Sequence, residues 1–193
     1  MAHFIHFIKN WKETGAVAPS SRFLVNDLVS QLRKDLQSGQ SESLKILEIG
    51  PGTGVLTKQI VKYLRPNDSL DVVEIHDHFY KLVNRKYSRD NVAVHHADFL
   101  KFNPTCKYDY IFSSLPYESI PKEISRKLWE KKLNCCKEEA YISYYKYLNF
   151  KKFRCDYEKK IVKKYRCDKK LVLLNLPPAH LFTLEVNLAN GVL

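Results

Sequence analysis

Residues 45–61 have the sequence KILEIGPGTGVLTKQIV, in which Gly50, Gly52 and Gly54 separate an apolar run from a segment of helical periodicity. The apolar run has the length of a strand, and from Val55 the apolar residues recur at helical spacing. Glycine adopts positive φ without a Cβ penalty and lets a backbone approach a ligand closely. A strand, a glycine loop and a helix in this order predict a ligand-binding turn at the carboxyl end of the first strand of an open α/β sheet.

Further apolar runs alternate with amphipathic stretches along the chain. Amphipathic helices, one of them at residues 121–134, separate strands that are predicted at residues 44–49, 69–75, 91–96, 108–114 and 140–147. Alternating strands and helices imply βαβ units, and therefore a mainly parallel sheet with helices on both faces.

The C-terminal part of the chain differs from this alternation. Residues 169–188, KKLVLLNLPPAHLFTLEVNL, contain two strand-like runs joined by Pro177 and Pro178, which predict a closing antiparallel hairpin. The hairpin brings the central sheet to seven strands. The 193 residues therefore predict one Rossmann-like α/β domain, with a core at residues 44–193 and an N-terminal helical segment at residues 1–37 that covers the site.

The composition limits the class of protein and its partners. The chain has 32 basic and 21 acidic residues, a formal net charge of +11, and 45% of its residues are hydrophobic. This hydrophobic share is typical of a globular protein and excludes a mainly disordered chain. The positive charge favours an anionic partner, either nucleic acid, an anionic membrane surface or a phosphorylated substrate.

The cysteines and the apolar runs indicate the compartment. The chain has neither C-x-x-C spacing nor a nearby histidine set around its five cysteines, Cys106, Cys135, Cys136, Cys155 and Cys167. We expect free thiols in a reducing compartment and no metal. No apolar run reaches the roughly 20 residues that cross a bilayer, and the N-terminus lacks the features of a signal peptide. These patterns predict a cytoplasmic protein, or one bound to a membrane surface without spanning it.

Two acidic residues follow later strands. Glu74 ends the second predicted strand, 20 residues after Gly54, where a carboxylate can accept hydrogen bonds from both hydroxyls of a ribose. Asp98 follows the third strand at a position suited to the amine of a purine, although Asp is also a common helix N-cap. The spacing G-x-G-x-G, with Val55 where a dinucleotide motif continues, argues against a nicotinamide dinucleotide.

This pattern of E-x-G-x-G-x-G, then Glu, then Asp resembles the class I S-adenosylmethionine-dependent methyltransferases. The resemblance implies S-adenosylmethionine as cofactor and S-adenosylhomocysteine as product. The methionine moiety would lie near the glycine loop, the ribose at Glu74 and the adenine at Asp98. The cofactor-binding residues implied in this way are Glu48, Gly50, Gly52, Gly54, Glu74, Ile75, Asp98, Phe99 and Ser114.

Residues 113–121, SSLPYESIP, follow the fourth strand, where amino-methylating enzymes of this fold carry their catalytic loop. In ribosomal RNA adenine dimethyltransferases this loop has the pattern N-[LI]-P-[YF], and Leu115, Pro116 and Tyr117 resemble three of its four positions. Ser114 replaces the Asn, whose amide carbonyl helps to hold the nucleophilic nitrogen. An adenine acceptor is therefore the weaker of two interpretations.

The other interpretation rests on the two ends of the chain. TGAVAPSSRFL, residues 14–24, and NLPPA, residues 175–179, are similar to motifs of the bacterial soluble-type phosphatidylethanolamine N-methyltransferases. The fourth-strand loop of those enzymes resembles S-G-L-P-L, which Ser113, Leu115 and Pro116 match. With the cofactor loop, this similarity covers nearly the whole chain. It implies methyl transfer to the amine of phosphatidylethanolamine or of its mono- and dimethyl derivatives.

Two segments suit an anionic surface. Phe4, Phe7 and Trp11 recur at helical spacing, which predicts an amphipathic helix that lies in a membrane interface or packs on the domain. Residues 151–170, KKFRCDYEKKIVKKYRCDKK, interleave cations with apolar residues at helical spacing, and their cationic face could contact lipid, RNA or solvent alone. The candidate partners of a lipid phosphate are Ser20, Ser21 and Arg22.

Methyl transfer requires an amine lone pair aligned with the methyl carbon, opposite the sulfur, with solvent removed from both. An ammonium acceptor must first lose a proton, to a general base or because its pKa is lowered. Tyr117 and Glu118 are the candidate catalytic residues, and Tyr117 could also offer a cation–π surface to a methylated ammonium.

These patterns together favour a phospholipid N-methyltransferase that is peripherally bound to the inner face of the cytoplasmic membrane, with an anionic membrane and a lipid substrate as partners. The alternatives are ribosomal RNA adenine N6-dimethylation, with RNA as the partner, and a non-enzymatic lipid-binding protein that retains the fold. The three glycines together with Glu74 argue against the last alternative, because a decayed site does not require them.

Overall fold

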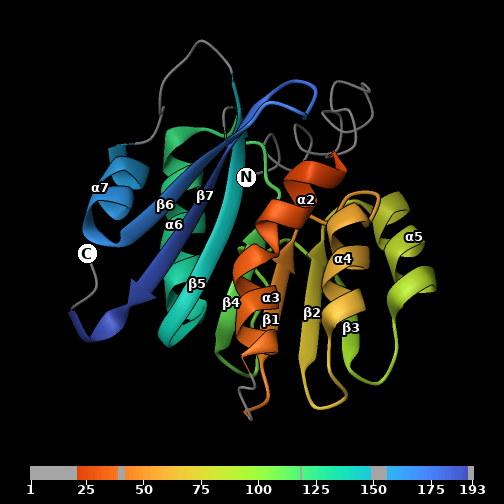
Figure 1. Ribbon diagram of the computed structural model, residues 1–193. Helices are drawn as coiled ribbons and strands as arrows, with labels where there is room; N and C mark the ends of the chain where they lie inside the picture. The colour runs from red at the N-terminus through yellow and green to blue at the C-terminus, as the bar shows by residue number, and fades with distance from the viewer. Residues whose placement is uncertain (1–20, 39–41, 118, 149–155, 191–193) are drawn as a thin grey trace.

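The computed structural model describes residues 21–38, 42–117, 119–148 and 156–190. They form one seven-stranded sheet in the order β3-β2-β1-β4-β5-β7-β6, with helices on both faces (Figure 1). The strands are β1 (Lys45–Ile49), β2 (Ser69–Glu74), β3 (Val92–His96), β4 (Tyr108–Ser113), β5 (Cys136–Tyr147), β6 (Arg166–Val172) and β7 (Ala179–Asn187). The helices are α2 (Arg22–Leu28), α3 (Ser30–Gln37), α4 (Val55–Tyr63), α5 (Asp77–Tyr87), α6 (Lys122–Cys135), α7 (Asp156–Lys164) and the 3-10 helix η1 (Leu188–Asn190). The predicted α/β fold is confirmed.

The strand directions bring the functional loops to one edge of the sheet. β1 pairs in parallel with β2 and β4, β2 with β3, and β4 with β5. β7 runs antiparallel to both β5 and β6, so the predicted closing hairpin is confirmed. Because parallel strands end at the same edge, the loops after β1, β2, β3 and β4 lie together there, and we call this edge the catalytic edge.

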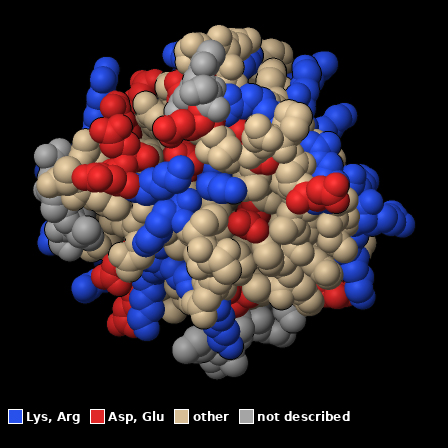
Figure 2. Space-filling model, turned by 90° about the horizontal axis from the view of Figure 1, so that it is seen from below, with Lys and Arg blue, Asp and Glu red and all other residues tan. Residues whose placement is uncertain are grey.

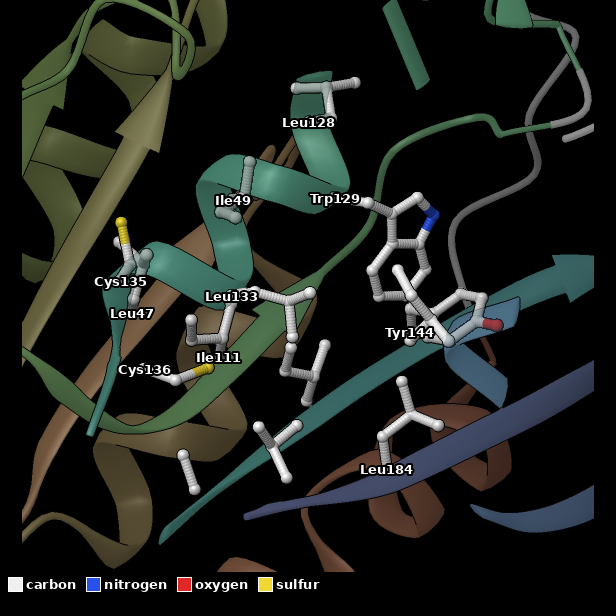
Figure 3. Packing of buried hydrophobic residues seen from close by; sticks show 14 of the residues in the cluster. Leu47, Ile49, Ile111, Leu128, Trp129, Leu133, Cys135, Cys136, Tyr144 and Leu184 are labelled. Carbon is white, nitrogen blue, oxygen red and sulfur yellow. The ribbon is translucent and has the colours of Figure 1, made fainter. Parts of the chain in front are cut away.

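Side chains alternate between two apolar cores, one on each face of the sheet. Ile46 belongs to the core under α2, α3, α4 and α5, whereas Leu47 belongs to the core under α6 and α7. In the second core, Trp129 of α6 is fully buried against Tyr144 of β5, with ring centroids 5.0 Å apart (Figure 3). Each fully buried large apolar side chain stabilises the fold by about 1.5–3 kcal/mol.

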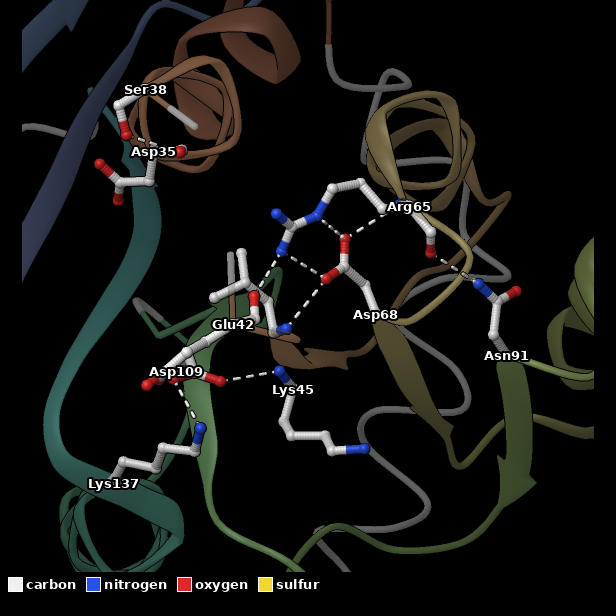
Figure 4. A network of polar contacts seen from close by, with 10 residues as sticks. Asp35, Ser38, Glu42, Lys45, Arg65, Asp68, Asn91, Asp109 and Lys137 are labelled. Carbon is white, nitrogen blue, oxygen red and sulfur yellow. Dashed lines mark hydrogen bonds and ion pairs between the residues drawn. The ribbon is translucent and has the colours of Figure 1, made fainter. Parts of the chain in front are cut away.

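A network of polar contacts fixes the opposite, amino-terminal edge of the sheet (Figure 4). The Asp68 carboxylate accepts hydrogen bonds from the Arg65 guanidinium at 2.8 and 3.0 Å and from the Leu44 backbone at 2.9 Å. Asp109 accepts from the backbone N–H of Lys45 at 2.7 Å and pairs with Lys137 at 2.8 Å. These contacts join the starts of β1, β4 and β5, so this edge is structural in character.

Two predicted elements have other bounds in the structure. β5 begins at Cys136 rather than at residue 140, because α6 runs directly into it and the charged residues 137–139 concealed the strand start. The helical pattern predicted for residues 151–170 is wrong beyond α7, since β6 begins at Arg166 as an edge strand paired only with β7. Edge strands carry lysines readily, because their outer side faces water.

The N-terminal helices belong to the core. Leu24, Leu28 and Leu32 of α2 and α3 are at most 2% exposed and pack with the sheet residues of the first core. Residues 22–37, expected to form part of a covering segment, therefore also complete one face of the sheet. Several predicted substrate- or membrane-contacting residues lie outside the described residues, namely Phe4, Phe7, Trp11 and Ser20.

Candidate active site

The glycine loop after β1 has a backbone that only glycine adopts readily. Gly50 and Gly54 have φ of +72° and +81°. A Cβ on Gly50 would lie 3.1 Å from Leu115 Cδ2, and one on Gly54 would lie 2.9 Å from Tyr87 Cε2. The loop therefore packs against the loop after β4 at its first glycine and against α5 at its last. Gly52 lies between them, with φ of +58°.

Glu74, the last residue of β2, has its carboxylate held by the backbone of two loops. It accepts a hydrogen bond from Gly52 N–H at 3.1 Å and another from His76 N–H at 2.9 Å. The residue is 1% exposed. The carboxylate is thus fixed at the end of the strand and at the pocket wall, and its binding of ribose hydroxyls stays a prediction.

A pocket at the catalytic edge gathers most of the predicted cofactor residues. Loops after four different strands contribute its walls: Ile49, Gly50, Val73, Glu74, Ile75, Asp98, Phe99, Leu115, Pro116 and Leu128. Five residues predicted from the sequence lie here, namely Gly50, Glu74, Ile75, Asp98 and Phe99. Leu128 of α6 was not foreseen, since nothing in the sequence of α6 distinguishes it from the other core leucines.

Asp98 combines a structural and a binding geometry. Its carboxylate accepts a hydrogen bond from Leu100 N–H at 2.9 Å, which stabilises the turn after β3. The same residue lines the pocket beside Phe99, which is 5% exposed. The turn-forming role that Asp commonly has therefore coexists with a position at the pocket wall.

Glu48 lies below the glycine loop rather than in the pocket wall. It is fully buried in β1, and the alternation of the strand places it on the same face as Ile46, toward α4 and α5. Burial raises the pKa of Tyr87 of α5, and the nearby Glu48 charge raises it further. Glu48 and Gly54 thus both lie near Tyr87, which indicates that this glutamate helps to fix the position of the glycine loop.

The loop after β4 borders the pocket through its apolar residues. Ser114 is half-buried, and its N–H donates to Ile49 O at 3.0 Å, which joins this loop to the end of β1. Leu115 and Pro116 line the pocket next to Gly50. Ser114 is not among the lining residues of the pocket but immediately precedes them.

Tyr117 turns away from the pocket. It is 2% exposed, and its hydroxyl lies 2.6 Å from Ser113 Oγ and 2.7 Å from Lys132 Nζ. Its ring packs on Trp129 at 5.8 Å between centroids. The predicted catalytic tyrosine is therefore engaged in the core beneath the loop, while Glu118, the other catalytic candidate, lies outside the described residues.

Lys132 is a buried amine that sequence reasoning missed. It is fully buried, with Nζ 3.1 Å from the centroid of the Trp129 ring. Burial lowers the pKa of Lys132 well below its usual range, against the opposing effects of Glu158 and Cys136. Its sequence position on α6, four residues after Leu128, was the one available signal, because that spacing places it on the core-facing side of the helix.

The two terminal motifs meet in space. Ser21 caps α2 by accepting from Leu24 N–H at 3.2 Å, and its own N–H donates to Asn175 Oδ1 at 2.8 Å. Asn175 is 3% exposed and donates in turn to Pro177 O at 2.7 Å. Arg22, at the start of α2, is exposed. Ser21, the last residue of the APSS motif, therefore contacts Asn175, the first residue of NLPPA.

Other site classes find little support in the described part of the chain. Among these residues there is no group of three or more His, Cys, Asp or Glu side chains that could hold a metal ion. Cys106, Cys135, Cys136 and Cys167 are free thiols, and Cys155 lies outside the described residues. Burial raises the pKa of all four of these thiols. None of the described helices has the length and apolarity needed to cross a membrane.

The fold and this pocket define a class I S-adenosylmethionine-dependent methyltransferase, and its cofactor is S-adenosylmethionine. The glycine loop fits such a cofactor, because a side chain on Gly50 would fill the wall beside Leu115. A family model described as ribosomal RNA adenine dimethylase matches residues 20–152, and the chain belongs to this family.

Individual methyltransferases of different kinds are similar to parts of the chain. Ribosomal RNA small subunit methyltransferase A of Mycoplasma capricolum is 34% identical over 101 residues, which are 49% of this chain and 35% of that protein. Malonyl-[acyl-carrier protein] O-methyltransferase 2 of Ilyobacter polytropus is 35% identical over 80 residues, which are 41% of this chain and 30% of that protein. The matches thus span only about a third of these relatives.

A solved structure confirms the fold over nearly the full length. Magnesium protoporphyrin IX methyltransferase from Synechocystis PCC 6803, with bound S-adenosylmethionine, superposes with a TM-score of 0.70 at 10% identity. The match covers 95% of this chain and 97% of that chain. At this identity the similarity establishes the architecture and leaves the methyl acceptor to other arguments.

Proposed function

We propose that this chain transfers methyl groups from S-adenosylmethionine to the exocyclic amine of an adenine in ribosomal RNA. The observation that carries the proposal is the family match over residues 20–152, which includes the glycine loop, Glu74 and the loop that follows β4. The formal net charge of +11 suits an RNA partner. The names of the matching relatives specify different acceptors, an RNA and an acyl-carrier protein. The choice of acceptor therefore rests on the loop after β4, which borders the pocket.

Each part of the site has a task in this reaction. The cofactor, when bound, supplies a methyl group on a sulfonium. Phe99, Leu115 and Leu128 form apolar walls that exclude water. The hydroxyl of Ser114, next to those walls, accepts a hydrogen bond from the acceptor amine and so orients its lone pair. Tyr117 acts indirectly in this proposal, because its buried hydroxyl holds the loop in place.

A second candidate acceptor is the amine of a phospholipid headgroup, and one observation favours it. The turn between β6 and β7 exposes Leu173, Leu174 and Leu176 by 67–79%, an unusual apolar surface for a soluble domain. Leu148 N–H donates to Pro178 O at 2.7 Å, which places this turn at the carboxyl end of β5 and therefore at the catalytic edge. A membrane that received these leucines would bring headgroups toward the pocket.

The test offers both acceptors to the same enzyme. Radiolabelled methyl transfer is measured with unmodified ribosomal RNA and, separately, with phosphatidylethanolamine vesicles that contain anionic lipid. We expect label in RNA, and we expect it to increase in Ser114→Asn, because the longer side chain supplies a carbonyl acceptor for the adenine amine. Label in lipid alone would overturn the proposal in favour of the second candidate.

Two variants separate the acceptors further. Replacing Leu173, Leu174 and Leu176 with Ser should abolish vesicle flotation and lipid methylation if the lipid is the acceptor, and should leave RNA methylation unchanged. Glu74→Ala should reduce transfer to either acceptor, since it acts on the cofactor. Transfer to RNA that is insensitive to Ser114→Asn would contradict the role given to Ser114.

A further inference from the structure

A groove lies between α6 and the segment that joins β3 to β4, on the flank of the molecule next to the cofactor pocket. It has a volume of about 680 Å³. Its floor includes Leu100 and Ile124, and its rim carries four lysines, Lys101, Lys107, Lys127 and Lys131. We call this feature the α6 groove.

The charges of the α6 groove are unbalanced. Lys131 Nζ donates to Leu100 O at 3.0 Å, and Lys107 Nζ donates to Asn134 O, so two of the ammonium groups are held in place by carbonyls. Among the described residues, none of the four rim lysines pairs with a carboxylate. The acid in the groove lining, Glu130, is already paired with Arg126 at 2.7 Å. The groove lining therefore has four lysines against one paired glutamate, an excess of positive charge.

The charges are mixed in sign on the face that contains the amino-terminal edge of the sheet. On the face seen from below the sheet, Lys and Arg side chains are intermingled with Asp and Glu (Figure 2). Several of these are paired, such as Lys137 with Asp109. A local excess of one sign bound into a concave surface attracts an anion more strongly than the same charges dispersed among acids.

The groove starts at the wall of the cofactor pocket. Phe99 lines that pocket, and Lys131 Nζ lies 5.8 Å from the centroid of its ring. The groove follows α6 from Ile124 to Asn134, a distance of about 15 Å at 1.5 Å per residue. This is long enough for a few nucleotides of an extended strand, which would pass beside the cofactor pocket.

We propose that the α6 groove binds the RNA strand next to the target nucleotide through its phosphates. This inference rests on the proposed methylation of RNA. The ammonium groups of the rim neutralise phosphates, while the apolar floor receives riboses or base faces. A concave track on the flank of the molecule suits a flexible strand better than a membrane, which would meet the protein at the exposed leucines of the catalytic edge.

The test measures how RNA binding depends on salt. Binding of a fluorescent single-stranded ribosomal RNA fragment is followed by anisotropy between 50 and 200 mM KCl for the full chain and two variants. Lys101→Gln with Lys127→Gln removes two exposed rim charges, and Lys58→Gln with Lys62→Gln removes two exposed charges from α4, on the opposite face of the sheet. All proteins are first checked for unchanged cofactor affinity.

We expect the rim variant to bind RNA more weakly and to lower the slope of log K against log salt by about 1.4, at about 0.7 per lost phosphate contact. The α4 variant should retain the wild-type slope. Equal slopes for both variants would overturn the inference, even if the wild type methylates RNA. A changed slope in the rim variant of a protein that methylates no RNA would support the groove and refute the proposed function. Weakened binding to anionic vesicles, with RNA binding intact, would assign the groove to a membrane instead.

Discussion

Replacing Glu74 with Ala should weaken cofactor binding by a predictable amount. The carboxylate is 1% exposed and is already oriented by the N–H groups of Gly52 and His76. A hydrogen bond to a charged group contributes about 1.5–3 kcal/mol, and this corresponds to a roughly 10- to 150-fold weaker Kd for S-adenosylmethionine. Glu74→Gln should give a smaller loss, because the amide retains one acceptor oxygen without the charge.

The assay is isothermal titration with S-adenosylmethionine and S-adenosylhomocysteine, preceded by thermal denaturation. Glu74→Ala also leaves two backbone N–H groups without their acceptor, so it should destabilise the fold by about 1–3 kcal/mol. Asp71→Ala is the matched control, because Asp71 lies on the same strand and accepts from Tyr108 Oη at 2.9 Å away from the pocket. It should destabilise the protein without changing Kd. A Kd within twofold of wild type in a folded Glu74→Ala protein would refute the ribose-binding role.

Three further substitutions test the physical account of the fold. Gly54→Ala should lower Tm by about 2–8 °C, because a side chain in the left-handed backbone conformation costs about 1–2 kcal/mol. Adding Tyr87→Ala should remove the contact of the new Cβ with the Tyr87 ring but not the cost of the backbone conformation. Burial raises the pKa of the Asp68 carboxyl, but hydrogen bonds from Arg65 and the backbone outweigh this effect, so its pKa in the folded protein is lowered. In urea titrations, the wild type should be more stable than Asp68→Asn above about pH 4, and the two stabilities should converge as the pH falls through the folded pKa. Burial lowers the pKa of Lys132, so between pH 7 and 9 the unfolded chain binds one proton more at this amine than the folded chain does. The free energy of unfolding of the wild type should therefore rise from pH 7 to 9, and Lys132→Met should flatten this rise. If the variant shows the same rise as the wild type, the amine is charged in the folded protein.

Sequence reasoning predicted residues that meet in one pocket because the signals for them are local. Gly50, Glu74 and Asp98 each follow a strand with clear apolar patterning, and parallel pairing alone brings the ends of those strands together. The structure places all three in one pocket. No long-range information was needed beyond the direction of the strands.

The acceptor half depends on contacts that no local pattern encodes. The sequence located the loop that begins at Ser113. The inward direction of Tyr117, however, depends on its contacts with Lys132 and Trp129, which lie on the core-facing side of α6. A lysine in an amphipathic helix normally faces solvent, so the spacing of Lys132 from Leu128 was too weak a signal to predict its burial. The contact of Ser21 with Asn175 joins residues 154 positions apart, and the two motifs gave no sign that they meet.

The position of β7 has a consequence for the order in which the protein is made. β7 is synthesised after the other six described strands, yet it lies between β5 and β6 and is the partner of both. While a ribosome is still translating residues 179–187, β1 to β4 can already pair, whereas β6 has no strand to join. The half that holds the predicted cofactor residues can therefore form during translation, and the half that carries the exposed leucines waits for β7. A nascent chain stopped before residue 179 would carry an unpaired β5 edge and be prone to aggregate.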